Sequence, residues 1–292
     1  MRKTVIKEAL KGASLRLKEA GIPGYGSEAA MLLSFCLKKD QVFIYTYPEE
    51  EISSKELDLF QQLVLKRASG VPFHYLVGNK EFMGLDFKVT PQVLIPRPET
   101  EILCQAVLDF AKEHYLEPFR LLDLCTGSGV LAVTLAKRLP SCRVWAVDLC
   151  PDALQVGKEN ARRHGVSEKI TFLEGDLWEP LRALEGLTFS VVVSNPPYVT
   201  TGELACLQRE VKDHEPLMAL EGGQDGLHFY RRIFGSLSIF LEPRGLIALE
   251  VGKGQILRVK SLAASTGIFK NMDVVKDYSG IERVLMAQSG EK

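Results

Sequence analysis

The tetrapeptide Asn195-Pro196-Pro197-Tyr198 combines residue types that suit a planar –NH₂ group. Two successive prolines fix the backbone φ angle and provide no N–H donor, so the loop is stiff and presents only carbonyl acceptors. The Asn195 side-chain oxygen and the Pro196 carbonyl can each accept one amino hydrogen, while Tyr198 packs on the face of the group. The alternative interpretation is a rigid turn that contains a buried asparagine.

Paired acceptors matter because the lone pair of an amide or aromatic amine nitrogen is delocalised, which makes the nitrogen a poor nucleophile. Acceptors that favour a pyramidal nitrogen weaken this conjugation and stabilise the positive charge that develops as a methyl group arrives. Such a reaction requires no strongly basic residue. The motif therefore predicts methyl transfer, with Asn195, Pro196 and Tyr198 as the catalytic residues.

A second candidate site is the glycine-containing loop from Asp123 to Gly129, which follows a β-rich run and precedes a helix expected near Val130. Glycine lets a ligand approach the backbone closely, and a helix N-terminus offers unpaired N–H groups. The segment from Gly127 to Ala132 also satisfies the G-x-G-x-x-G/A dinucleotide pattern. Asp148 ends the next strand, 19 residues after Gly129, where a carboxylate would accept hydrogen bonds from ribose hydroxyls.

This loop predicts an adenosine-bearing cofactor, and the alternative interpretation is an ordinary tight turn. Two details favour S-adenosylmethionine over NAD. A carboxylate, Asp123, precedes the loop, and it suits a cationic sulfonium with an amino group better than it suits a pyrophosphate. The other detail is the Asn-Pro-Pro-Tyr motif, which a NAD-dependent dehydrogenase would leave without a role.

Several motifs together resemble the protein-(glutamine-N5) methyltransferases that act on peptide chain release factors, the HemK or PrmC type. The resemblance covers nearly the whole chain. Asn-Pro-Pro-Tyr alone also marks adenine-N6 methyltransferases, and the stretches Ile95 to Glu101 and Glu221 to Leu227 narrow the match. The other matching stretches are Val71 to Gly78, Asp123 to Gly129, Asn195 to Tyr198 and Asp277 to Gly280.

The resemblance implies methyl transfer from S-adenosylmethionine, with S-adenosylhomocysteine as product, to N5 of the glutamine in the Gly-Gly-Gln motif of class 1 release factors. It also implies that Asn195 to Tyr198, Pro196 and Pro197 included, hold the substrate glutamine, and that Asp176 and Leu177 flank the adenine. The other residues expected to contact the cofactor are Asp123, Cys125, Thr126, Gly127, Ser128, Gly129, Asp148 and Asn195.

The chain departs from the family pattern at two positions. The family usually has glycine where Cys125 stands and often an aromatic residue where Leu177 stands. A Cβ atom narrows the allowed backbone angles, so Cys125 can shift the methionine end of the cofactor. Arg97 and Glu99 are candidates for substrate binding at the active-site entrance, and the alternative is that they cap the helix that follows.

The elements that position these motifs differ between the two parts of the chain. Apolar residues in the first 20 positions recur at steps of three and four, which indicates an amphipathic helix, and Ser27 and Ser54 can each cap a further helix. We expect a small helical substrate-recognition domain over residues 1–78. A β-hairpin of Phe82 to Leu85 and Phe87 to Thr90, with a proline-rich linker, completes residues 79–97.

From about Phe119, short β-rich runs alternate with helical stretches, which is typical of a parallel sheet covered on both faces. The last two runs, Asp273 to Lys276 and Arg283 to Met286, are joined so tightly that they should pair antiparallel. Residues 98–292 are therefore expected to form the α/β methyltransferase domain, and the resemblance implies a seven-stranded Rossmann-like sheet, mostly parallel with the last strand antiparallel. The earlier runs are Arg120 to Leu124, Arg143 to Val147, Ile170 to Leu173, Phe189 to Val193 and Leu246 to Val251.

Charge and composition bear on the competing functions. The chain has 292 residues, of which 46% are hydrophobic, and 36 Lys and Arg against 37 Asp and Glu give a net charge of -1. Residues 1–95 hold 13 basic and 11 acidic residues, so neither part resembles a DNA clamp. This disfavours the main alternative, an adenine-N6 methyltransferase that acts on nucleic acid, and we expect no direct DNA binding.

Other functional classes fit less well. A catalytically silent module that docks on translation factors would have no need of an intact Asn195 and Pro196. The cysteines and histidines show no metal-ligand spacing, so no metal is expected. The absence of a long apolar stretch and of an apolar segment after the basic N-terminus predicts a cytoplasmic protein without membrane contact. We also expect a monomer.

Overall fold

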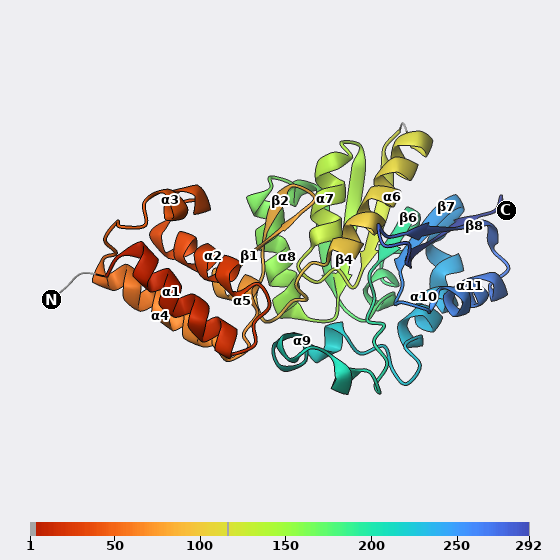
Figure 1. The fold of residues 1–292 in the computed structure, drawn as a ribbon. Coiled ribbons are helices and arrows are strands. Elements are labelled where there is room, and N and C mark those ends of the chain that lie inside the picture. The colour runs from red at the N-terminus through yellow and green to blue at the C-terminus, as the bar shows by residue number, and fades with distance from the viewer. Residues whose placement is uncertain (1–3, 116, 292) are drawn as a thin grey trace. The chain divides into compact units, whose positions relative to one another are not determined.

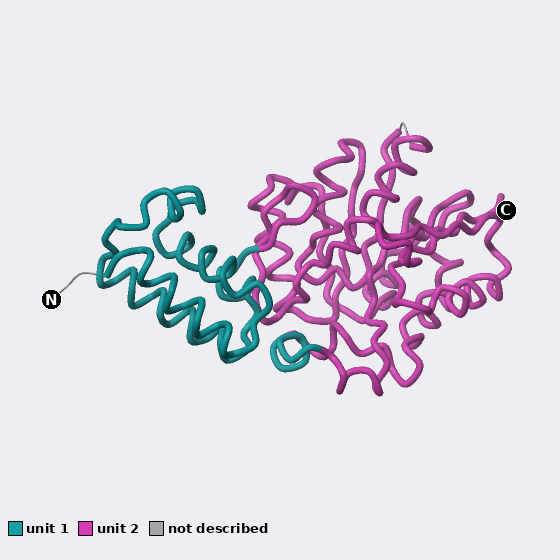
Figure 2. The backbone as a smooth tube through the Cα atoms, viewed as in Figure 1, with its two compact units in different colours: residues 1–79, 208–214 teal, residues 80–207, 215–292 magenta. Residues whose placement is uncertain are grey.

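The computed structural model describes residues 4–115 and 117–291, which divide into two compact units. The first, here called the helical unit, comprises residues up to Asn79 together with residues 208–214. The second, the sheet unit, comprises residues 80–207 and 215–292. Figure 1 labels the elements of both units, and Figure 2 shows the helical unit in teal and the sheet unit in magenta.

Helices of the helical unit bury one apolar stripe each, and these stripes form a common core that includes Leu17, Leu33 and Phe60. The predicted N-terminal helix is confirmed, whereas both predicted caps are wrong by a few residues. Ser53, not Ser54, forms a capping box with Glu56, and Ser27 lies inside a helix that begins after Gly24. The helices are α1 (Ile6–Glu19), α2 (Tyr25–Leu37), α3 (Gln41–Thr46), α4 (Ser54–Ala68) and α5 (Phe73–Val77).

A distant segment belongs to the helical unit, which the sequence does not suggest. Helix α9 (Arg209–His214) lies within residues 208–214. Arg67 of α4 is only 3% exposed; its Nε donates to Glu28 Oε2 over 2.5 Å, and its Nη1 lies 2.9 Å from Glu210 Oε2. A buried guanidinium is stable only when it is paired, so these two carboxylates explain why α9 groups with the N-terminal helices.

The hairpin exists, but its strands begin three residues and two residues earlier than predicted. They are β1 (Asn79–Phe82) and β2 (Leu85–Lys88). Met83 and Gly84 form the two-residue turn with φ angles of 53° and 76°. Both angles are positive, as the tight hairpin turn requires. The prediction was wrong because methionine is an unusual residue in such a turn and reads as part of a strand.

The sheet unit contains a seven-stranded sheet in the order β5-β4-β3-β6-β7-β9-β8, which confirms the predicted fold class. Strands β3 to β7 are parallel to one another, and β9 lies antiparallel between β7 and β8. The strands are β3 (Phe119–Leu124), β4 (Cys142–Asp148), β5 (Ile170–Glu174), β6 (Phe189–Ser194), β7 (Leu241–Glu250), β8 (Phe269–Lys276) and β9 (Glu282–Ser289).

Helices cover both faces of this sheet (Figure 1). Successive side chains of a strand point to opposite faces, so Leu121 of β3 joins one core and Leu122 the other. Helices α6 (Pro98–His114), α7 (Val130–Arg138) and α8 (Pro151–Arg163) pack on the first face, and α10 (His228–Phe240) and α11 (Ile256–Ser265) on the second. Single turns of 3₁₀-helix span Ser167–Lys169, Glu179–Leu181, Leu204–Cys206 and Leu217–Ala219.

The order of the strands determines where a ligand can bind. From β3 the chain continues to β4 on one side, whereas β6, on the other side of β3, continues to β7. Open α/β sheets bind ligands at the carboxyl ends of the strands where the order reverses in this way. The glycine loop follows β3 and the Asn-Pro-Pro-Tyr motif follows β6, and Ser194 Oγ donates to the Leu124 carbonyl over 2.7 Å to join the two strand ends.

Among residues 4–115 and 117–291, none of the helices combines the length and the apolar character that a bilayer span requires.

Candidate active site

A cavity of about 220 Å³ lies at the carboxyl ends of β3 to β6. Residues from the loop after each of these strands reach its wall, together with the segment before α6 and the segment before α10. The two motifs singled out in the sequence therefore contribute to one cavity. The predicted site residues on its wall are Cys125, Gly127, Asp148, Asp176, Leu177, Asn195 and Pro197.

Asp123 is placed differently from the sequence argument, since its carboxyl group is fully buried and is not on the cavity wall. Its Oδ2 accepts hydrogen bonds from Thr126 Oγ1 over 2.6 Å and from the Ala132 backbone N–H over 3.2 Å. Its Oδ1 has no hydrogen-bond partner among the described residues. The two hydrogen bonds to Oδ2 brace the loop, and Oδ1 remains an unused acceptor. Burial raises the pKa of Asp123 to about 7.

The glycine loop has an unusual backbone. Cys125, Gly127 and Gly129 have φ angles of 59°, 53° and 78°, and this left-handed region is costly for any residue other than glycine. Cys125 therefore carries backbone strain. A Cβ on Gly129 would lie 3.2 Å from the Gly157 Cα of α8, so the second glycine also allows the loop to approach that helix. Thr126, Ser128 and Gly129 are buried behind the wall.

Asp148 connects the end of β4 to this loop. Its Oδ2 accepts the backbone N–H of Gly127 over 2.8 Å, and its Oδ1 accepts that of Cys150 over 2.9 Å. Each carboxylate oxygen retains a second lone pair that a ligand hydroxyl can use. Burial raises the pKa of Asp148, and the backbone hydrogen bonds oppose that shift.

Asp176 and Leu177 form the wall beyond β5. Asp176 Oδ2 accepts a hydrogen bond from Arg232 Nη2 of α10 over 2.7 Å, which anchors this loop to the second helical layer. Leu177 is buried and has a φ angle of 52°, the left-handed region again. Its side chain, with those of Leu149 and Phe229, makes this part of the wall apolar.

Asn195 is the first residue after β6, and a chain of hydrogen bonds holds its side chain. Asn195 Nδ2 donates to Thr100 Oγ1 over 3.1 Å, and Thr100 Oγ1 donates to Glu250 Oε2 over 2.7 Å. The Tyr198 hydroxyl donates to Glu250 Oε1 over 3.2 Å. Sequence reasoning missed Thr100 and Glu250, although an acidic residue at the end of the apolar strand β7 was a usable signal.

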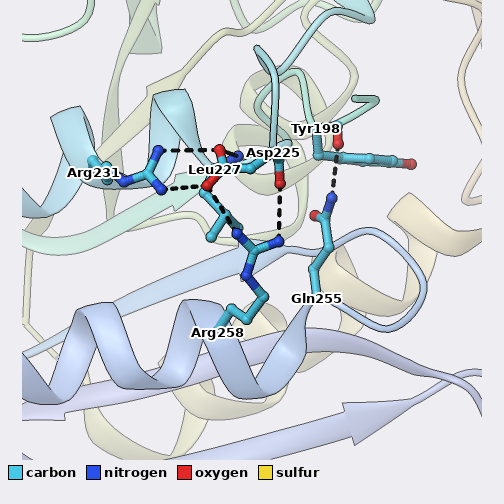
Figure 3. A network of polar contacts seen from close by, with 6 residues as sticks. All are labelled: Tyr198, Asp225, Leu227, Arg231, Gln255 and Arg258. Atoms are coloured by element: carbon cyan, nitrogen blue, oxygen red, sulfur yellow. Dashed lines mark hydrogen bonds and ion pairs between the residues drawn. The ribbon is translucent and has the colours of Figure 1, made fainter. Parts of the chain in front are cut away.

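The backbone of the motif is braced from behind by Gln255, which precedes α11. Gln255 Nε2 donates to the Tyr198 carbonyl over 2.8 Å (Figure 3). Gln255 Oε1 accepts the Gly252 N–H over 3.2 Å. A Cβ on Gly222 would lie 2.7 Å from the Tyr198 Cα. Glycine at position 222 therefore allows the segment Glu221 to Leu227 to lie directly against the motif.

That segment is anchored by Asp225, as Figure 3 shows. The Asp225 carboxylate accepts hydrogen bonds from the guanidinium groups of Arg231 and Arg258, and its Oδ1 accepts the Leu227 backbone N–H over 3.1 Å. The hydrogen bond from Arg231 is the main reason that the pKa of Asp225 is lowered, and the carboxyl group is ionised at neutral pH. One aspartate thus joins the segment behind the motif to both α10 and α11.

Arg97 and Glu99 lie off the cavity wall. Arg97 Nη2 donates to Glu215 Oε1 over 2.6 Å, and no side-chain hydrogen bond from Arg97 caps α6. Glu99 lies in the first turn of α6, with Oε1 3.6 Å from Arg283 Nη2. Glu215 Oε2 also accepts the Ile95 N–H over 3.4 Å, so the ion pair between Arg97 and Glu215 fixes the segment before α6.

Several wall residues lay outside the sequence prediction. The sequence argument gave these residues no chemical role. The usable signals were the proline-rich character of the segment before α6 and the matching stretch that begins at Glu221. They are Gln92, Val93 and Leu94 before α6, Val147, Leu149 and Cys150 next to Asp148, Ala153 of α8, Gly175 next to Asp176, Pro216, Met218, Ala219 and Glu221 before α10, and Phe229 within it. Among the described residues, no group of three or more His, Cys, Asp or Glu side chains gathers in a way that could hold a metal ion.

Comparison with known proteins agrees with this arrangement. Residues 8–78 match the family model of the PrmC N-terminal domain, and residues 121–214 match a methyltransferase domain. A Pyrococcus furiosus methyltransferase superimposes on 79% of this chain and 98% of its own, with a TM-score of 0.52 and 18% identity. The hMettl16 catalytic domain in complex with MAT2A 3′UTR hairpin 1 covers 90% of this chain and 91% of its own, with a TM-score of 0.58 and 16% identity, which shows the fold alone.

Relatives with higher identity match almost the full length. The release factor glutamine methyltransferase of Moorella thermoacetica is 41% identical over 98% of this chain and 99% of its own. That of Clostridium acetobutylicum is 39% identical over 98% of this chain and 99% of its own. This chain is therefore a methyltransferase enzyme that belongs to the release factor glutamine methyltransferase family.

Proposed function

We propose that this enzyme transfers a methyl group from S-adenosylmethionine to the side-chain nitrogen N5 of the glutamine in the Gly-Gly-Gln motif of class 1 release factors. The names of the full-length relatives support a release factor as the substrate. The observation that carries the proposal is the Asn195 side chain on the cavity wall. Its nitrogen is engaged by Thr100, which leaves its oxygen as an acceptor for an –NH₂ group.

The cavity suits S-adenosylmethionine. Asp148 offers free lone pairs to ribose hydroxyls, and Leu149, Leu177 and Phe229 provide an apolar surface for a flat base. Asp123 lies off the wall but braces the glycine loop, since its Oδ2 accepts hydrogen bonds from Thr126 Oγ1 and the Ala132 N–H. When bound, S-adenosylmethionine supplies an electrophilic methyl group on a sulfonium and leaves as S-adenosylhomocysteine.

The motif acts on the nitrogen that receives the methyl group. Asn195 Oδ1 and the Pro196 carbonyl accept the two hydrogens of the glutamine amide, and Tyr198 packs on its face. As the new C–N bond forms, the nitrogen gains positive charge, which these two oxygens stabilise without reorganising. The nitrogen then releases one proton to solvent, so no general base is needed in the chain.

An exocyclic adenine amine also carries two hydrogens, so an adenine-N6 methyltransferase is the second candidate. A nucleic acid substrate would require a basic surface that holds phosphates. The net charge of -1 shows no excess of positive charge over the chain as a whole. We therefore propose a protein as the substrate. We also propose that the enzyme is a cytoplasmic monomer.

The test is to incubate the enzyme with radiolabelled S-adenosylmethionine and, in parallel, with a folded class 1 release factor or with duplex DNA and RNA. We expect label in the release factor, at the Gly-Gly-Gln glutamine by peptide mass spectrometry. A Gln→Ala release factor is the matched control and should remain unlabelled. Label in the nucleic acid instead would reject the proposal and favour the second candidate.

A further inference from the structure

Glu250 has a position that packing alone does not explain. It is the last residue of β7, it is 1% exposed, and both of its carboxylate oxygens accept hydrogen bonds, from Thr100 and Tyr198. Its backbone carbonyl also accepts the Tyr230 hydroxyl over 2.9 Å. A buried carboxyl group costs free energy, and a leucine there would fit the apolar strand. Its hydrogen bonds lead to the motif after β6.

The direction of these hydrogen bonds fixes the identity of the Asn195 atom that faces Thr100. A threonine hydroxyl carries a single hydrogen, and that of Thr100 points to Glu250 Oε2 over 2.7 Å. The hydroxyl oxygen can therefore only accept from Asn195. The atom of Asn195 at 3.1 Å is accordingly the nitrogen Nδ2, and the oxygen Oδ1 occupies the opposite side of the carboxamide.

We propose that Glu250, acting through Thr100, is a positioning residue that fixes the orientation of the Asn195 carboxamide and keeps Oδ1 available to the substrate. The two orientations of an asparagine amide have almost the same shape, so packing distinguishes them poorly. The reversed orientation would direct a donor toward the donor hydrogens of the glutamine amide. The catalytic part of this inference depends on the proposed function, whereas the orientation is a property of the chain itself.

The charge of Glu250 should control the direction of the chain of hydrogen bonds. The groups that face it are Thr100 and Glu99 of α6, Tyr198 of the motif, Tyr230 of α10 and Arg283 of β9. Burial raises the pKa of Glu250 to about 7, with a smaller contribution from Glu99, while hydrogen bonds and Arg283 oppose the shift. Burial also raises the pKa values of both tyrosines, so they stay neutral near pH 7.

Protonation of Glu250 would reverse the direction of the hydrogen bonds that run through Thr100 to Asn195. When Oε2 carries a proton, it donates to Thr100, and the Thr100 hydrogen can then point to Asn195, which favours the orientation with Oδ1 toward Thr100. The productive orientation is therefore held above about pH 7 and lost below it. Asp123 titrates in the same range, so the pH dependence of the wild-type rate alone does not identify Glu250.

Thr100→Val tests the catalytic part, because valine keeps the shape and removes the hydroxyl. We expect kcat on the release factor to fall by about tenfold or more, with little change in the KM for S-adenosylmethionine, and Thr100→Ser to restore most of the loss. Thr134→Val is the matched control: Thr134 is buried in α7, its hydroxyl has no hydrogen-bond partner among the described residues, and kcat should not change. A folded Thr100→Val enzyme with wild-type kcat would overturn the inference.

The orientation itself can be followed without any substrate. In protein labelled with ¹⁵N at asparagine, the Asn195 side-chain signals are assigned by their loss in Asn195→Ala. We expect them to titrate with a midpoint of about 7 in the wild type and to be independent of pH in Glu250→Gln, with folding of each variant checked by circular dichroism. Signals that do not move in the wild type, or that titrate equally in Glu250→Gln, would overturn the inference. A normal titration without methylation of a release factor would instead reject the proposed function alone.

Discussion

Asp148 Oδ2 accepts the backbone N–H of Gly127 over 2.8 Å, and this hydrogen bond ties the end of β4 to the loop after β3. The residue predicted to bind ribose thus also determines the shape of the neighbouring loop. A second hydrogen bond, from Cys150 N–H to Oδ1 over 2.9 Å, holds the carboxylate plane in place. The orientation of the lone pairs that remain on Asp148 is therefore set before a ligand binds.

Asp148→Ala should weaken the binding of S-adenosylhomocysteine by about 1.5 to 3 kcal/mol, because the ribose hydroxyls lose a charged acceptor. Isothermal titration calorimetry gives the affinity directly. Glu174→Ala is the matched control, since Glu174 ends the neighbouring strand β5 in register with Asp148 but is exposed and off the cavity wall. An unchanged affinity in Asp148→Ala would show that the carboxylate faces away from the ligand.

Asn195→Ala should abolish most methyl transfer and leave cofactor binding largely in place. Loss of one oriented acceptor should raise the barrier by on the order of 3 kcal/mol, by analogy with the removal of one oxyanion-hole donor. Single-turnover transfer to a release factor measures the first quantity, and calorimetry with S-adenosylhomocysteine the second. Turnover close to that of the wild type would exclude the proposed role of Asn195.

The sequence was sufficient to predict the sheet and the two motifs because their signals are local. A β-rich run followed by Asp123 to Gly129, and another followed by Asn195 to Tyr198, predicted that both motifs lie at strand ends, as the structure confirms. Short β-rich runs in alternation with helical stretches were enough to indicate the fold. The tight link between the last two runs likewise predicted their antiparallel pairing, which is confirmed.

Features that depend on distant contacts could not be predicted in this way. An acidic residue at the end of an apolar strand makes Glu250 noticeable, but its partner Thr100 lies 150 positions earlier and cannot be identified from the local sequence. Likewise, Arg67 and Glu210 give no local sign that they form an ion pair. Met83 in the hairpin turn illustrates a different reason. The hairpin imposes a positive φ angle there, which methionine itself disfavours.

Cys125 offers a test of backbone strain in the glycine loop. In most positions alanine is at least as stabilising as glycine, but at a φ of 59° a Cβ atom is destabilising because it crowds the backbone. Cys125→Gly should therefore be more stable than Cys125→Ala by about 1 kcal/mol, although it has one methyl group less. Urea unfolding of the two variants gives this difference, and an Ala variant as stable as the Gly variant would show that the loop relaxes around the side chain.

Glu250→Gln should change how stability depends on pH. The pKa of Glu250 is about 7 in the folded state against 4.5 ordinarily, so the folded protein holds this proton more tightly than the unfolded chain does. The free energy of unfolding therefore falls as pH rises from about 4.5 to about 7, and the Glu250→Gln variant lacks this contribution. Relative to the variant, the wild type should lose about 3 kcal/mol across that range. Urea unfolding at several pH values measures this loss, and parallel curves would contradict the shifted pKa.

The helical unit contains no part of the cavity wall, and we propose that it recognises the body of the release factor. Binding energy from such a remote contact would position one glutamine and offset the entropy lost on docking. A short peptide with the Gly-Gly-Gln tripeptide lacks that contact and should be a far poorer substrate than the folded factor. Deletion of residues 1–79 alone is an unsuitable test, since it would leave Glu210 without its partner Arg67.

Point variants on the exposed side of α3 avoid this problem. Val42 and Tyr45 are 72% and 62% exposed, and the double variant Val42→Ser, Tyr45→Ser should lower kcat/KM for the folded factor by about tenfold if these residues contact it. The rate with the peptide should not change. Leu257→Ser in α11 of the sheet unit, where Leu257 is 77% exposed, is the matched control and should affect neither substrate. Equal losses of activity on factor and peptide would show that α3 supports the enzyme as a whole, and recognition through this helix would have to be abandoned.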